Sequence, residues 1–372
     1  MANIYQELDT LNILQERRDF DWTGIHIRWP NQNPLALLLS ELAKEKAINP
    51  EYNHFEDELL ADVVTVDGTQ TTSATILLHD ATSIVAGEML HNPRTGTNKR
   101  VQSVDQSANT VTFASVTGET WNDNDEIINI GPTHAEGSTV ADPVTTKVEK
   151  KYNYCQIFKK TISLTKTLQA SGMRGPAEEQ HQVQMAEKHF DRAVEYAFMF
   201  GQRAESTLNG KPIRQTGGLI EWITTNVTDV HGTTLDESVF DGWLKDVFEN
   251  GDTDTRIVLA SPTLMQAITG FSKNRLQTVM GQNTYGLNIT QYISPFGTVK
   301  LIMHRLLKGN VYGSYGICLD LNNLKYKWLR DVMLRRNIQS DKDDEIMHEI
   351  ISEVGLKLIN EKAHGIIYDF TA

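Results

Sequence analysis

The sequence lacks the features of a membrane protein or a disulfide-stabilised domain. Only two of its 372 residues are cysteines, Cys155 and Cys318, each in a strand-like stretch. Buried free thiols are the better interpretation, and a disulfide is the less favoured alternative. The apolar run LALLL ends before Ser40 and is far shorter than the roughly 18 residues of a membrane span. No secretory signal is visible at the start of the chain, so we expect a protein that stays in the cytoplasm, without a membrane partner.

Short motifs with a known mechanism are also missing. The sequence contains no GxxxxGK[ST], GxGxxG, GxSxG, HExxH or CxxC, and its eleven histidines include no pair at one-turn helical spacing. The stretch DNDE at 123–126 resembles part of a calcium loop but lacks the mid-loop glycine and the terminal glutamate, so a turn is the better interpretation. We therefore assign no catalytic, cofactor-binding or metal-binding residue, and predict a protein that is not an enzyme.

Positive charge is scarce. The chain has 35 Lys and Arg against 48 Asp and Glu, a formal net charge of −13. Proteins that bind DNA through its phosphates need clustered Lys and Arg, so this balance argues against that function. The hydrophobic content of 40% is ordinary for a soluble protein, and the length allows two or three domains with substantial cores.

The most regular stretch of the chain is residues 175–210. Apolar residues recur there at three- and four-residue steps: Val183, Ala186, Phe190, Ala193, Val194, Ala197 and Phe198. This spacing, with Pro176 suited to a first turn and Gly201 able to end the helix in a left-handed conformation, predicts a helix of about 25 residues.

Charged residues follow the same predicted helix. Glu187, Asp191 and Glu195 lie four residues apart, which is compatible with a metal or acid/base site but is far more typical of a solvated face. His181 and His189 are about two turns apart, too far for a shared ion. We therefore interpret the helix as a structural element.

The first half of the chain changes its residue pattern twice. Residues 1–34 are interpreted as an arm, followed by a short helix that starts at Asn33 or Pro34 and covers NPLALLLSELAKEKAIN. Residues 47–62 carry acids but no Lys or Arg, and predict a solvated segment or a surface for a basic neighbour. Short alternating runs then predict a small β-barrel or sandwich: VVTV, TILLHD, MLHN, RVQSV, TVTFASV and EIINI, between residues 63 and 133.

A long strand-like stretch, residues 142–168, precedes the helix. It interleaves lysines with Tyr152, Tyr154 and Phe158, a combination that suits single-stranded nucleic acid because phosphates and bases both find partners. The alternative is an extended arm whose aromatic residues pack and whose lysines face acidic neighbours. The acidic balance of the chain favours the arm.

The second half of the chain predicts an α/β core. DESVFDGWLKDVFENG reads as an amphipathic helix starting near Thr234 or Asp236, and TRIVLAS as a buried strand before a helix with Ser261 as its cap. Residues 272–297 predict a long loop. Further strands are expected at TVKLIMHR, YGICLDL and KYKWLRDVML, and the alternation of Val354, Leu356 and Leu358 ties the C-terminus into a sheet.

Taken in order, these segments resemble a tailed-bacteriophage major capsid protein with an α+β fold of the Hong Kong 97 type, from the subfamily with a β-rich insertion. The resemblance covers residues 34–60 and 142–372. It is carried by YNYCQIFKKTISLT, EKHFDRAVEYAFMFG, RQTGGLIEWI, DTRIVLASPTLMQAI and EVGLKLINEKAHGIIYDF. None of these is a catalytic fingerprint, and the specificity lies in their order.

The resemblance implies a division of the chain. The expected parts are an N-terminal arm and short helix at 1–56, an extended-loop limb with an inserted β-barrel-like domain at 57–141, a return strand and spine helix of the peripheral domain at 142–215, an axial α/β domain at 216–335 and a C-terminal return to the peripheral domain at 336–372. The long helix would be a girder in a shell wall.

The resemblance also implies partners. Copies of the chain would form hexamers and pentamers of an icosahedral virion capsid, assembled in the host cytoplasm around double-stranded DNA, which they meet only by non-specific proximity. Scaffold, portal and decoration proteins are further partners of such a shell, and no cofactor is implied. Three alternatives stay open: an encapsulin-like compartment shell, a hydrolase or carbohydrate-binding enzyme with an accessory β-domain, and a virion accessory or adhesion protein.

Overall fold

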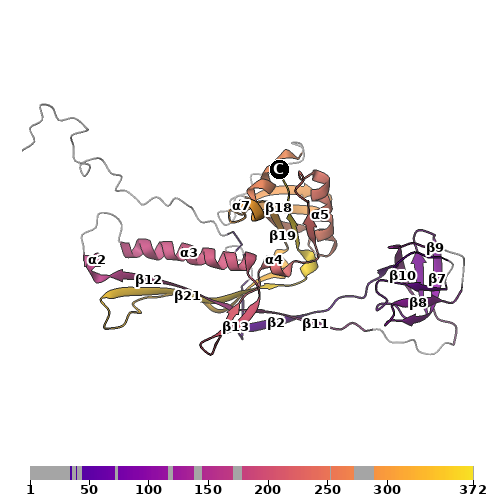
Figure 1. The fold of residues 1–372 in the computed structure, drawn as a ribbon, viewed down its shortest axis with the longest axis horizontal. Helices are drawn as coiled ribbons and strands as arrows, with labels where there is room; N and C mark the ends of the chain where they lie inside the picture. The colour runs from indigo at the N-terminus through magenta and orange to yellow at the C-terminus, as the bar shows by residue number, and fades with distance from the viewer. Residues whose placement is uncertain are drawn as a thin grey trace, which may run out of the picture. The chain divides into compact units, whose positions relative to one another are not determined.

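The computed structural model has a mixed α+β fold in which strands predominate (Figure 1). It describes residues 34, 35, 39, 44–71, 74–115, 120–137, 145–170, 178–251, 253–271 and 289–371, without the side chains of residues 169, 178, 289 and 290. The chain divides into two compact units: unit 1 is Met1–His54 with Tyr152–Ala372, and unit 2 is Phe55–Lys151. Of the predicted arm, residues 1–34, only Pro34 lies among the described residues.

A long helix on a sheet forms the first part of unit 1. The sheet has four strands in the order β1 (Lys44–Lys46), β20 (Leu324–Arg335), β21 (Glu345–Leu358) and β12 (Gln156–Thr165), and helix α3 (Glu178–Phe200) packs against β12 and β21. Strand β12 pairs with β21 along its whole length, from Gln156 opposite Val354 to Thr165 opposite Glu345.

Helix α3 confirms the predicted long helix. Phe190, Val194 and Phe198 are buried in the core, as their spacing predicts, whereas Ala193 is exposed. The helix ends at Phe200, next to the predicted Gly201, but for a different reason from the one expected. Gly201 is not among the glycines with positive φ. Instead, a Cβ atom there would clash with the carbonyl oxygens of Ala197 and Thr216, so glycine is needed for close packing.

A second, six-stranded sheet forms the other part of unit 1. Its strand order is β15 (Val227–Asp229), β22 (Gly365–Tyr368), β19 (Tyr315–Leu319), β16 (Thr255–Ala260), β18 (Gly297–Met303) and β17 (Ile289–Ser294). Helices α5 (Glu237–Glu249) and α6 (Pro262–Gly270) pack against it and share its core. Ser261 caps α6 as predicted, because its hydroxyl accepts a hydrogen bond from Leu264 N at 3.2 Å.

Four predictions for these regions need correction. Lys44–Lys46 form strand β1, where the short helix was expected to continue. Residues 289–294 form strand β17, although residues 272–297 were predicted to be a loop. Strand β20 belongs to the four-stranded sheet, although residues 216–335 were assigned to one axial domain. Conversely, the last strand, β22, pairs in the six-stranded sheet, so only β21 returns to the sheet under the long helix.

Unit 2 consists of strands and turns in its described residues. A six-stranded sheet has the order β3 (Val63–Thr65), β10 (Glu126–Pro132), β6 (Glu88–Asn92), β7 (Thr97–Asp105), β8 (Thr110–Phe113) and β5 (Thr75–Leu77), while β4 (Gln70–Thr71) pairs with β9 (Thr120–Trp121). Its own core includes Val66, Leu90 and Trp121. The strands predicted between 63 and 133 are present, and β7 and β8 form a hairpin that turns between Asp105 and Asn109.

Strands β2 (Glu51–Glu56) and β11 (Glu149–Tyr154) form a two-stranded sheet through which the chain leaves and re-enters unit 1. None of the described helices is long and apolar enough to cross a membrane.

Candidate functional site

A buried asparagine fixes the point where the strand pair β2–β11 meets the core of unit 1. Asn153 donates to the carbonyl oxygens of Leu356 at 2.7 Å and Gly217 at 3.1 Å. Its Oδ1 atom accepts from Gly217 N and from Tyr154 N, both at 2.8 Å. One side chain thus hydrogen-bonds to backbone groups of three segments in the interior. We interpret this junction as the root of the extended strands.

Close packing reinforces the same junction. The Tyr52 hydroxyl donates to Leu356 O at 2.7 Å, and burial, followed by the neighbouring Cys155 thiol, raises the pKa of Tyr52. A Cβ atom on Gly355 would lie 2.6 Å from both Tyr154 O and the Tyr52 hydroxyl. Strand β2 therefore fits against β21 only because residue 355 has no side chain.

A second junction joins the long helix to the six-stranded part of unit 1. Glu195 of α3 and His304, just after β18, are both fully buried, with Glu195 Oε1 2.7 Å from His304 Nε2. The same carboxylate oxygen accepts from Leu35 N at 3.0 Å. The prediction that the acidic row of this helix is a solvated face is therefore wrong for Glu195, although Glu187 and Asp191 are exposed.

The lysine-rich stretch before the helix has acidic neighbours. Lys159 lies 4.0 Å from Glu349 and Lys166 lies 3.5 Å from Asp344, while β11 pairs with the acidic strand β2. Tyr154 and Phe158 are 8% and 7% exposed. Buried rings cannot stack on bases, so these two residues do not form the single-stranded nucleic-acid platform, and the packed-arm interpretation is confirmed for them.

The six-stranded sheet contains a buried polar network. Arg256 lies 3.2 Å from Asp320, and Asp320 N donates to His364 Nδ1 at 3.2 Å. Burial lowers the pKa of His364 to about 4, so the imidazole is neutral at physiological pH. Both cysteines are buried free thiols, as predicted, and burial raises the pKa of each to about 12, which makes them poor nucleophiles.

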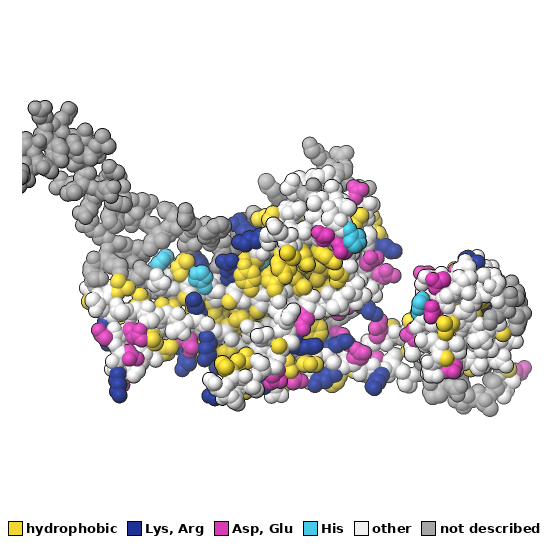
Figure 2. Space-filling view, viewed as in Figure 1, with side chains coloured by type: hydrophobic (Ala, Val, Ile, Leu, Met, Phe, Trp, Pro, Cys, Tyr) yellow, Lys and Arg dark blue, Asp and Glu magenta, His cyan; other side chains and the backbone are white. Residues whose placement is uncertain are grey.

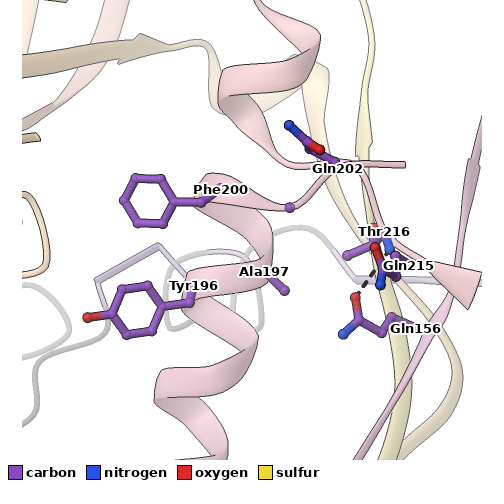
Figure 3. Close-up of a pocket in the computed structure, with 8 residues that line it drawn as sticks. Gln156, Tyr196, Ala197, Phe200, Gln202, Gln215 and Thr216 are labelled. Atoms are coloured by element: carbon purple, nitrogen blue, oxygen red, sulfur yellow. Dashed lines mark hydrogen bonds between the residues drawn. The ribbon is translucent and has the colours of Figure 1, made fainter. Parts of the chain in front are cut away.

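A cavity of about 430 Å³ lies at the C-terminal end of α3. In Figure 3, Tyr196 and Phe200 project from the helix on one side, while Gln156 and Gln215 lie together on the other, where Gln156 Oε1 accepts from Thr216 N at 3.2 Å. Gln202 completes this side of the lining. Amide and aromatic side chains line the cavity, and we assign it no ligand.

Three side chains that no sequence motif groups lie close together in unit 2. Asp67, His79 and Asp123 of unit 2 place one potential metal-ligand atom each within 4.8 Å of one another. All three are exposed, and their separation along the chain leaves no spacing signal. The adjacent DNDE stretch forms the predicted turn, in which Asp125 pairs with Arg94 at 2.8 Å. We assign no function to the trio.

The fold matches solved capsid structures. One is the capsid of a native GTA particle, with a TM-score of 0.53, 11% identity and coverage of 99% of this chain and 100% of that chain. Another is from Mycobacterium phage Cain, with a TM-score of 0.52, 8% identity and coverage of 98% and 100%. At this identity the likeness concerns the fold alone. A major capsid protein of Pseudomonas phage PaMx41 is 22% identical over 327 residues, 81% of this chain and 76% of that protein.

The mixed α+β fold of this chain is thus of the class found in these capsid structures. Residues 23–371 match the model of the SU10 major capsid protein, and the chain belongs to this family. It is a phage major capsid protein, which assembles with copies of itself into the capsid of the virion. This finding favours the phage capsid over the encapsulin-like, enzymatic and adhesion alternatives.

Proposed function

We propose that the chain builds an icosahedral head shell with the Hong Kong 97-type architecture. The observation that carries this proposal is the packing of one long helix on a four-stranded sheet, joined through a shared core to an α/β part and continued by two extended strands. In this assignment α3 is the spine helix, and its sheet is the peripheral domain. The six-stranded sheet with α5 and α6 is the axial domain, whose loops meet at the centres of hexamers and pentamers.

The paired strands β2 and β11 would be the extended loop that overlaps a neighbouring subunit. The net charge of −13 supports a wall that encloses double-stranded DNA without attracting it, because an acidic surface repels phosphates. The subunit would assemble in the host cytoplasm, with scaffold, portal and decoration proteins as further partners.

Electron microscopy of the chain expressed alone tests this proposal. We expect closed shells, or rings and sheets of hexamers, after size-exclusion chromatography. A Glu195→Ala variant should form irregular or fewer particles, because it loosens the junction between the two domains, whereas the exposed Glu187→Ala provides a matched control on the same helix. A wild-type chain that stayed monomeric, even with the scaffold protein of its phage, would contradict the proposal.

We further propose that unit 2 is an inserted domain that braces adjacent subunits from the extended loop. It has its own core, independent of unit 1, which supports treating it as a separate folding module. Replacing residues 62–134 with a Gly-Ser linker tests the role. Reduced heat stability of the shells is expected, whereas shells of unchanged yield and stability would show that unit 2 projects from the surface without bracing it.

A further inference from the structure

The hairpin after α3 is specified by its sequence but buries almost nothing. Strands β13 (Ala204–Leu208) and β14 (Lys211–Gln215) pair only with each other among the described residues. Asn209 and Gly210 both have positive φ, +52° and +74°, as a two-residue hairpin turn requires. Every residue of the two strands except Arg214 is exposed. A two-stranded hairpin is marginally stable in water, so this one gains from a contact outside its own fold.

The base of the hairpin is nevertheless held firmly. Arg203 N donates to Glu221 Oε2 at 2.6 Å, its guanidinium donates to Tyr152 O at 2.8 Å and it stacks 4.3 Å from the centre of the Tyr152 ring. Glu205 and Arg214, directly opposite each other, form a 3.0 Å ion pair. These contacts hold the base of the hairpin in place, while its surface stays exposed. An exposed surface on a fixed base is suited to contact with another molecule.

The two faces of the hairpin differ. Glu205 and Arg214 share one face with Thr207 and Pro212, and Tyr154 approaches that face through Glu205 at 3.5 Å. The opposite face carries Leu208, 60% exposed, Ile213, 38% exposed, and the cation Lys211. Gln215 continues this second face into the cavity at the end of α3. Figure 2 shows hydrophobic and basic side chains at the surface where Figure 1 draws the hairpin.

A segment with the opposite character follows β2. Residues 57–62, DELLAD, form no regular secondary structure and are all exposed. Leu59 is 91% and Leu60 39% exposed, and the acids Asp57, Glu58 and Asp62 surround them. An exposed apolar pair flanked by acids matches an exposed apolar pair beside a lysine in both hydrophobicity and charge.

We infer that residues 57–62 of one copy dock on the Leu208–Ile213 face of the β13–β14 hairpin of a neighbouring copy. The inference rests on the proposed function, because the strands that present residues 57–62 are those assigned to the overlapping extended loop. Docking buries Leu59 and Leu60 against Leu208 and Ile213 and places Lys211 next to Asp62. The partner is a second copy because this chain assembles with itself.

Engineered cysteines test the contact. Two differently tagged chains, Leu208→Cys and Leu59→Cys, are co-assembled and oxidised with copper phenanthroline. The native Cys155 and Cys318 are buried and stay out of the reaction. We expect a mixed disulfide dimer as the main cross-linked product. Ile48→Cys replaces Leu59→Cys as the matched control, because Ile48 is equally exposed, at 92%, but lies near Lys44 and Lys46; it should give only background.

Electron microscopy of the same samples separates the outcomes. Shells without a mixed dimer would overturn the inference and leave the proposed function standing. An intrachain disulfide in a Leu208→Cys/Leu59→Cys chain, with no mixed dimer from the single variants, would show docking within one copy and also overturn it. A wild-type chain that formed no capsomers would refute the proposed function and the inference together.

A charge exchange gives a second readout. Lys211→Glu should cause a loss of mixed dimer and of shells, because it places a carboxylate beside the acidic segment. Adding Asp62→Lys to the same chain should restore both. Failure of the second change to rescue assembly, in a chain whose thermal unfolding is unaltered, would contradict the proposed pairing.

Discussion

Glu195 and His304 lie 2.7 Å apart with both side chains fully buried, one on the long helix and the other just after a strand of the six-stranded sheet. The carboxylate also holds the backbone of Leu35. Three segments distant in sequence therefore meet at one buried side chain, which links the two parts of unit 1.

Removing this carboxylate should be costly. Glu195→Ala is expected to lower the free energy of unfolding by about 3–5 kcal/mol, because it leaves a buried imidazole and a backbone N–H without their partner. Urea denaturation of the unassembled subunit measures the effect. Glu187→Ala, on the same helix but exposed, should change stability by no more than about 0.5 kcal/mol. Equal effects of the two substitutions would contradict a structural role for the pair.

Replacing Asn153 with aspartate, which has the same shape, should destabilise the fold. Asn153→Asp keeps the shape but loses both donors, and places a carboxylate against Leu356 O and Gly217 O. We expect the free energy of unfolding to fall by roughly 3 kcal/mol or more, because the buried Gly217 carbonyl loses its amide donor and an unpaired charge is buried. The comparison is Asn53→Asp on the exposed side of β2, which should be nearly neutral. A neutral Asn153→Asp would mean that the junction does not depend on these hydrogen bonds.

Gly355 should be replaceable by no other residue. Gly355→Ala places a Cβ atom 2.6 Å from Tyr154 O and from the Tyr52 hydroxyl, and should cost about 1–3 kcal/mol through displaced backbone. Gly242→Ala, within α5, meets nothing within 4 Å and should instead stabilise by about 0.5–1 kcal/mol through helix propensity. In thermal unfolding, we expect Gly355→Ala to lower the midpoint temperature and Gly242→Ala to raise it. A stabilising Gly355→Ala would show that β2 is not packed closely there.

Stability should fall in mild acid because of His364. Its pKa is lowered from 6.5 to about 4 by burial, so between these values the unfolded chain binds a proton that the folded chain does not. The histidine therefore favours unfolding increasingly as the pH falls from about 6.5 to about 4, by roughly 3 kcal/mol in total. His364→Asn, which keeps an acceptor for Asp320 N, should flatten that part of the stability profile.

Urea denaturation at several pH values between 4 and 7 measures the stability profiles of this variant and of the unmodified protein. A His364→Asn profile parallel to that of the unmodified protein would show that this imidazole is not the source of the acid sensitivity.

Periodicity alone predicted the elements that bury one face. The three-and-four spacing around Phe190 and Val194 predicted α3, the short alternating runs predicted the strands of unit 2, and Ser261 marked the start of α6. These patterns are readable because local geometry sets the repeat: about 3.6 residues in a helix and two in a strand. Low positive charge and the absence of catalytic motifs also favoured a structural protein, and the order of the elements resembled a capsid subunit.

Tertiary structure decided which polar residues serve the fold. Glu195 has the same four-residue spacing as the exposed Glu187 and Asp191, and only the approach of His304 and Leu35 makes it an interior residue. Tyr52 and Asn153 both bond to Leu356 O although 304 and 203 residues separate them from it, and β22 joins one sheet while β21 joins the other. A sequence determines local periodicity, but burial depends on what packs against a side chain, and that neighbour comes from a distant segment of the chain.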